Sequence, residues 1–149
     1  MFECVGEQMM SMALDNLERD GYVAFATLVL SKQGEMTPLL LETVNDESKD
    51  NLANMLRALA PHCSAIVVIA EAWTLVDSDA IRALGEGNRV ADSPARKVGV
   101  FVQVASQEGD LLLTTVFERD LNDRPIRPAD VTMAWQCGAI STRFQGLFA

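Results

Sequence analysis

The chain has 149 residues, of which 49% are hydrophobic and 22% are charged, and its formal net charge at pH 7 is −9. This length suits a single domain with a real core, and the apolar content is too high for a disordered chain. Nucleic acids and anionic membranes are bound by clustered lysines and arginines, so the acidic balance argues against both as partners.

An amphipathic helix is expected over residues 3–20. Its apolar residues recur every three or four positions, and Gly21 suits the position just past a helix end. The helix contains Met9, Met10 and Met12. An amphipathic helix normally packs on its own sheet, so we interpret these methionines as core residues, with a dimer contact as the alternative.

Two strands, a helix and a third strand are expected next, over residues 22–31, 36–44, 47–60 and 64–76. The turn between the first two strands contains Gly34, which tolerates positive φ. Pro38 cannot donate a ladder hydrogen bond, which favours an edge position for the second strand or a place at the start of a strand. The helix would form a right-handed crossover between strands.

The second half of the chain combines a hairpin with polar segments. A polar loop is expected over residues 77–95, with a short helix from Ser78 to Leu84. Strands over 96–106 and 111–118 would form the hairpin, followed by a charged loop. An extended tail is expected over residues 131–149, where two late phenylalanines suggest docking onto a partner or a neighbouring subunit. The whole pattern predicts a two-layer α+β domain spanning residues 1–149, with a mixed sheet of about five strands, one crossover helix and the N-terminal helix.

Glu71 is the first candidate site residue, because it follows the apolar run from Ala65 to Ala70. Burying a carboxylate is costly unless it is paired or protonated. One interpretation is an acid or base beside Trp73, with Arg96 binding an anionic ligand. The alternative is structural: an ion pair between Glu71 and Arg96, or exposure of Glu71 at the end of the strand.

Cysteine and histidine chemistry is weakly indicated. Cys4, Cys63 and Cys137 are widely spaced, which fits reduced thiols in a cytoplasm and gives no zinc spacing. His62 precedes Cys63, but adjacent residues leaving a helix usually diverge, so a buried thiol and an exposed histidine are expected. No metal and no cofactor are predicted.

The chain resembles a family of small uncharacterised bacterial and phage-type α+β proteins over residues 22–120. The resemblance rests on the strand ending Glu71-Ala72-Trp73, on Ser93-Pro94-Ala95-Arg96 and on the valine-rich hairpin that follows. The family's loop more often ends Asp-Pro-Asp-Arg, so Ser93 and Ala95 depart from it. The resemblance implies an α+β fold and no particular activity.

Three functions are therefore considered. The first is a non-enzymatic cytoplasmic interaction protein that self-associates or binds another protein, through the methionine-rich helix or the aromatic tail. The second is a small-ligand-binding protein or enzyme with its site around Glu71, Trp73 and Arg96. The third is an acidic mimic of nucleic acid, which would cluster its carboxylates on one face.

Overall fold

The computed structural model describes residues 1–39, 45–74, 78–84, 93–94, 96–136, 144 and 147–148. Its elements in chain order are α1 (Phe2–Asp20), β1 (Ala26–Leu30), β2 (Met36–Leu39), α2 (Asp46–Leu59), the 3-10 turn η1 (Ala60–His62), β3 (Ala65–Thr74), α3 (Ser78–Leu84), β4 (Lys97–Ser106), β5 (Gly109–Val116), β6 (Glu118–Arg119), β7 (Pro125–Ile126) and β8 (Thr132–Gln136). The predicted ends of the second and third strands, at 40–44 and 75–76, lie outside the described residues, as do 85–92, 95 and Cys137.

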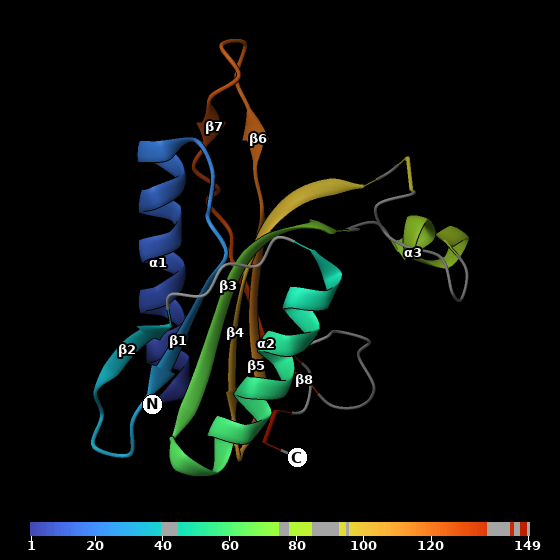
Figure 1. The fold of residues 1–149 in the computed structure, drawn as a ribbon. Helices are drawn as coiled ribbons and strands as arrows, with labels where there is room; N and C mark the ends of the chain where they lie inside the picture. The colour runs from blue at the N-terminus through green and yellow to red at the C-terminus, as the bar shows by residue number, and fades with distance from the viewer. Residues whose placement is uncertain are drawn as a thin grey trace.

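A six-stranded sheet in the order β2-β1-β3-β4-β5-β8 forms the centre of the molecule (Figure 1). Each neighbouring pair is antiparallel. β2 and β3 run in the same direction with β1 between them, so α2 is a crossover connection, as predicted. The α+β class, the N-terminal helix and the crossover helix are confirmed.

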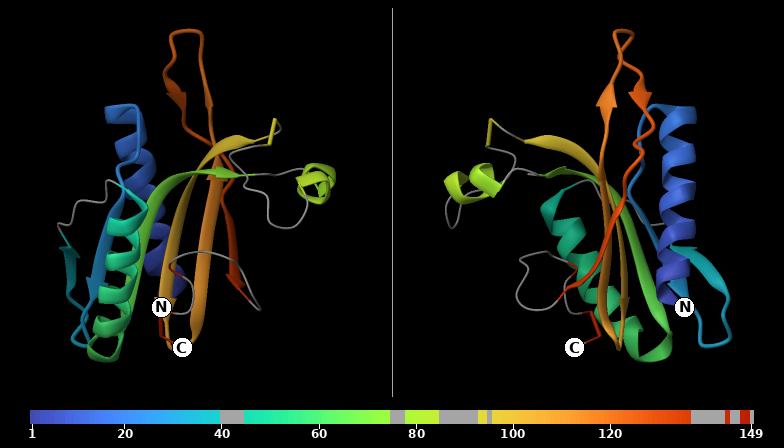
Figure 2. Two further views of the ribbon diagram at one scale, coloured as in Figure 1. Left: turned by 45° about the vertical axis from the view of Figure 1, so that its right-hand side comes forward. Right: turned by 180° about the vertical axis from the view of Figure 1, so that it is seen from behind.

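The two long helices cover opposite faces of this sheet, which the two turned views show (Figure 2). Residues of α1 share a core with Val67, Ile69 and other residues on one face of β3. Residues of α2 share a second core with Ile66 and Val68 on the other face. The consecutive apolar residues of β3 are thus explained, because each face of the strand meets a helix.

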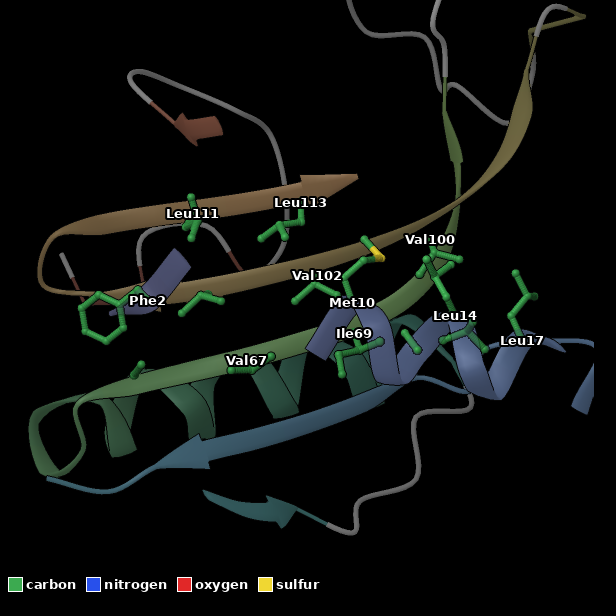
Figure 3. Packing of buried hydrophobic residues seen from close by; sticks show 14 of the residues in the cluster. Phe2, Met10, Leu14, Leu17, Val67, Ile69, Val100, Val102, Leu111 and Leu113 are labelled. Atoms are coloured by element: carbon green, nitrogen blue, oxygen red, sulfur yellow. The ribbon is translucent and has the colours of Figure 1, made fainter. Parts of the chain in front are cut away.

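α1 packs on the sheet through one stripe of residues, which includes Met10, Leu14 and Leu17 (Figure 3). The helix ends at Gly21, whose φ of 84° is left-handed and whose N–H donates to the carbonyl oxygen of Leu17. Gly6 lies where the helix meets β5: a Cβ there would be 2.5 Å from Leu113 Cδ1. The absence of a side chain at this position allows the close approach.

α2 begins with a capping box. The side chain of Asn45 accepts from the Ser48 N–H, and the Ser48 hydroxyl oxygen accepts from the Asn45 N–H. Its core also buries Phe144 and Leu147 from the end of the chain, and the Phe144 ring lies 5.8 Å from that of Phe25. Phe144 therefore packs against the chain's own core, where the sequence suggested docking onto a partner.

The segment from residue 118 to 136 is more ordered than the predicted loop and tail. β6 and β7 pair as a short arm that projects from the sheet (Figure 1). The Asp120 carboxylate accepts the N–H groups of Asn122 and Arg124, which closes the turn at the tip. β8 then returns to pair with β5 as the last strand of the sheet. Among the described residues, no helix is long and apolar enough to cross a membrane.

Candidate functional site

Glu71 hydrogen-bonds to the backbone that joins α1 to β1. Its Oε1 accepts the N–H of Val23 at 2.6 Å, and the side chain is half-buried. Val23 itself is buried beside α1. Among the interactions of the described residues, Glu71 makes no ion pair with Arg96. The carboxylate therefore has a structural partner that the sequence did not indicate, because a backbone amide leaves no pattern in the sequence.

Trp73 and Arg96 are brought together at the far ends of β3 and β4. The Arg96 guanidinium carbon lies 4.8 Å from the centroid of the Trp73 ring, which is a cation–π contact. Arg96 Nη1 also donates to the carbonyl oxygen of Ser93 at 3.1 Å. Of the three predicted site residues, two are in contact, while Glu71 lies on the same strand and binds elsewhere.

A different concave site lies between α1 and the segment that leads from β7 into β8. We call it the α1 cleft, and its volume is about 250 Å³. The wall on α1 consists of Glu7, Met10, Ser11 and Leu14, the floor includes Leu113, and the opposite wall is formed by Arg127 to Ala129 and by Val131. Met10, Leu14 and Leu113 are buried and apolar, whereas Glu7 and Ser11 are exposed at the rim. This combination suits a ligand whose apolar group contacts the floor while an adjacent polar or charged group stays at the rim.

Arg127 holds the opposite wall of the cleft against α1. Its Nη1 lies 2.7 Å from Asp15 Oδ1 and 2.8 Å from Glu18 Oε1. The hydrogen bonds to these two carboxylates raise the pKa of Arg127 above its ordinary value. The charge of Arg127 is therefore already matched. Glu7 makes no hydrogen bond or ion pair with the described residues, so the rim is left with an unmatched negative charge.

β8 is tied to the beginning of α1 by a hydrogen bond. Trp135 Nε1 donates to Glu3 Oε1 at 3.2 Å. The pKa of Glu3 lies below its ordinary value, first because its own backbone N–H donates to the carboxylate and then because Trp135 does. Met133 is directly opposite Leu113 in the sheet and is 42% exposed, and Val131 is 40% exposed. Val131 in the wall of the α1 cleft and Met133 on β8 lie two residues apart, so they form one exposed apolar surface.

The cysteines and the histidine form no reactive set in the described part of the chain. Cys63 is buried, and its Sγ contacts the carbonyl oxygens of Leu59 and Ala60. Burial raises the pKa of the Cys63 thiol. His62 is exposed. In the part of the chain that the structure describes, no group of His, Cys, Asp or Glu could hold a metal ion.

Of the residues that line the α1 cleft, only Met10 was considered for binding from the sequence, as a dimer contact on the methionine-rich helix. The segment with Arg127 was interpreted as a solvated loop, although Asp15 and Glu18 are spaced three residues apart on one helix face and offered it a partner. Residues Val131, Met133 and Trp135 alternate with polar or small residues, which is the pattern of a strand. Those two signals could have indicated this site.

No protein-family model, curated protein or solved structure matches the chain. The family resemblance seen in the sequence therefore gains no support from these comparisons.

Proposed function

We propose that this protein is a non-enzymatic interaction protein that binds a segment of another protein in the α1 cleft. The observation that carries the proposal is the combination of a buried apolar floor with an exposed shelf, Val131 and Met133, that continues beyond it. Contiguous exposed apolar surface rimmed by polar residues is typical of sites where proteins interact. A volume of about 250 Å³ accommodates one or two side chains rather than a whole cofactor.

The small-ligand site expected around Glu71, Trp73 and Arg96 is less well supported. The Glu71 carboxylate is engaged by Val23, and Arg96 is held by Trp73 and by Ser93. Each side chain thus has a partner within the chain, so none of them needs a ligand to explain its position.

The mimicry of nucleic acid requires carboxylates gathered on one face. α1 carries five acidic residues, but Asp46, Glu47 and Asp50 belong to α2, which covers the opposite face of the sheet. Acidic side chains on both faces favour solubility more than imitation of a duplex. We therefore prefer the interaction protein.

Location and self-association are parts of the same proposal. Cys4 is exposed on α1 and Cys63 is buried, and both are free thiols. An exposed free thiol is compatible with a reducing compartment, which supports the cytoplasm as the place of action. Self-association, predicted from the sequence, remains the alternative to a different partner protein and is measured by sedimentation of the purified chain.

Selection from a library of random dodecapeptides displayed on phage tests the proposal. Peptides enriched on the wild-type protein are synthesised, and their affinity for the wild type is compared with their affinity for the variant Ser11→Trp. This substitution places a large ring at the rim of the cleft. We expect the affinity to fall at least about tenfold, because side chains of the peptide can no longer reach the floor.

The matched control is Met12→Trp, which adds the same ring to the exposed face of α1 outside the cleft. It should bind the selected peptides like the wild type. Equal binding by Ser11→Trp, or no enrichment over an unrelated protein of the same charge, would show that the cleft is not a binding site. Circular dichroism establishes that both variants keep their helix content.

A further inference from the structure

The outer edge of β8 lies beside the α1 cleft and has an unusual composition for the edge of a sheet. Its sequence is Thr-Met-Ala-Trp-Gln, with no proline and no charge. The opposite edge, β2, contains Pro38. Natural proteins usually protect exposed edges with proline, charged side chains or bulges, because an unprotected edge pairs with other strands.

The outer edge of β8 offers main-chain hydrogen bonds to a partner. β5 pairs with one side of β8, and no described strand pairs with the other side. In an antiparallel strand, alternate residues direct their N–H and C=O groups away from the neighbour that they already have. A partner in extended conformation can therefore add to the sheet, as in other complexes that use β-augmentation.

Side chains of such an added strand would meet the apolar shelf. Met133 and Trp135 lie on the face that α1 covers, because their register partners Leu113 and Leu111 belong to the core beneath α1. Alternate side chains of an added strand would lie on this same face, next to exposed Met133. Those that meet Val131 and Met133 would be apolar, since the shelf is.

The charges near this edge favour a basic partner. α1 contains five acidic residues and one arginine. Asp15 and Glu18 bind Arg127, whereas Glu7 at the rim binds none of the described side chains. A lysine or arginine among the side chains that the added strand directs toward the α1 face would reduce this negative potential.

The same charges disfavour a second copy of the chain at this edge. Antiparallel pairing of β8 with β8 of another copy would use a two-fold axis perpendicular to the sheet. Both α1 helices would then lie on the same face of the joined sheet. Glu7 of one copy would then lie on the same face as Glu7 of the other, and the two chains would each carry a net charge of −9. Like charges brought together cost affinity.

We propose that the α1 cleft and the edge of β8 together bind an extended segment of another protein by strand addition to β8, and that this segment directs apolar residues and a lysine or arginine toward the face that α1 covers. This inference rests on the proposed function, since it names the class of partner for the same cleft.

The probe is the heptapeptide Thr-Val-Thr-Lys-Thr-Val-Thr, whose valines and lysine lie on one face of an extended strand, compared with its counterpart that has glutamate in place of lysine. We expect the basic peptide to bind at least about tenfold more tightly, and to shift the amide resonances of Met133, Ala134 and Trp135. Methylating alternate amide nitrogens of the peptide should abolish binding in one register and leave it in the other, because an extended strand directs alternate N–H groups toward β8.

Glu7→Lys tests the charge of the rim, with Glu35→Lys in the β1–β2 turn as the control of equal charge. The first variant should weaken binding of the basic peptide about three- to tenfold, and the second should leave it almost unchanged. Equal affinities for the two peptides, equal effects of both methylated forms, or shifts confined to another surface would overturn the inference.

Failure of this inference and of the proposed function are distinguishable. If peptides selected from the random library bind the cleft but the valine–lysine peptide does not, the protein is an interaction protein with a different partner. If the wild-type chain dimerises and Met133→Lys abolishes the dimer, the occupant of the edge is a second copy and the basic partner is wrong.

Discussion

The two edges of the sheet differ in how they are protected and in what lies beside them. β2 is a strand of four residues whose third position is Pro38, and it follows the turn at Gly34, which has a φ of 90°. β8 contains no residue that prevents pairing, and it lies next to the α1 cleft. From this contrast we expect association to be disfavoured at the β2 edge and favoured at the β8 edge.

The two edges are also attached to the molecule differently. β2 is half-exposed, and its described contacts with the cores are made by Met36 and Leu39. β8 is tied to α1 through the bond between Trp135 and Glu3 and lies against β5, whose Leu111 and Leu113 are fully buried. A rigid edge loses less entropy when a partner binds, so β8 is the better place for a binding site.

Moving α1 away from β5 should change the β8 side of the sheet more than the β2 side. Gly6→Val places branched carbon atoms against Leu113, where even a Cβ would be 2.5 Å from Cδ1. We expect a loss of about 2 kcal/mol in the free energy of unfolding, because a packed core does not absorb the added volume. Urea denaturation measures it, and hydrogen exchange should show faster exchange in β8 than in β2.

Gln8→Val is the matched control, since it introduces the same branched residue on an exposed position of α1. Helix propensity alone should cost it only a few tenths of a kcal/mol. If the two variants are equally stable, α1 does not depend on the close approach at Gly6, and the rigidity of the β8 edge needs another explanation.

The hydrogen bond between Trp135 and Glu3 should make the β8 edge sensitive to acid. The pKa of Glu3 is lowered from 4.5 by its own backbone N–H and then by Trp135. A carboxyl group whose pKa is lower in the folded chain contributes stability above its ordinary pKa and loses it as the pH falls through the lowered value. Below a pH of about 4.5, protection of β8 amides should therefore decrease more than that of β2 amides.

Trp135→Phe removes the donor and keeps an aromatic ring. We expect it to lower the stability of the β8 edge at neutral pH, because one hydrogen bond is lost, and to reduce the difference between the edges in acid. Hydrogen exchange at pH 7 and pH 3.5, corrected for intrinsic rates, measures both effects. An unchanged acid response in this variant would assign the effect to a carboxyl group other than Glu3.

Sequence patterns predicted one edge and missed the other, and the reason is physical. Pro38 reports its position directly, because a proline restricts where a strand can lie. The sequence of β8 alternates apolar and polar or small residues, as a strand does. Its pairing with β5 and its hydrogen bond to Glu3, however, join residues far apart in the chain, and Trp135 and Glu3 are 132 positions apart.

The same limit explains Glu71, whose partner is a backbone N–H 48 residues away. Any residue type can supply that donor, so the identity of residue 23 carries no signal. Helices were predictable because their periodicity and their ends are local: the repeat that ends at Leu17 and the left-handed Gly21 are both visible in the sequence. The site depends on long-range contacts and was found only from the structure.

Pro38→Val should make the β2 edge more similar to the β8 edge with little effect on stability. Pro38 is exposed, so the change in the free energy of unfolding should be below about 0.5 kcal/mol. Its nitrogen is expected to face outward, since a proline in a sheet is tolerated where no ladder hydrogen bond is lost.

Valine restores an N–H at that edge, and sedimentation velocity at rising protein concentration should then detect more association than for the wild type. Thr37→Val, which changes the neighbouring residue without adding a donor, should behave like the wild type. If Pro38→Val sediments like the wild type as well, the proline is not what distinguishes the two edges, and the charge and shelf around β8 must account for the difference alone.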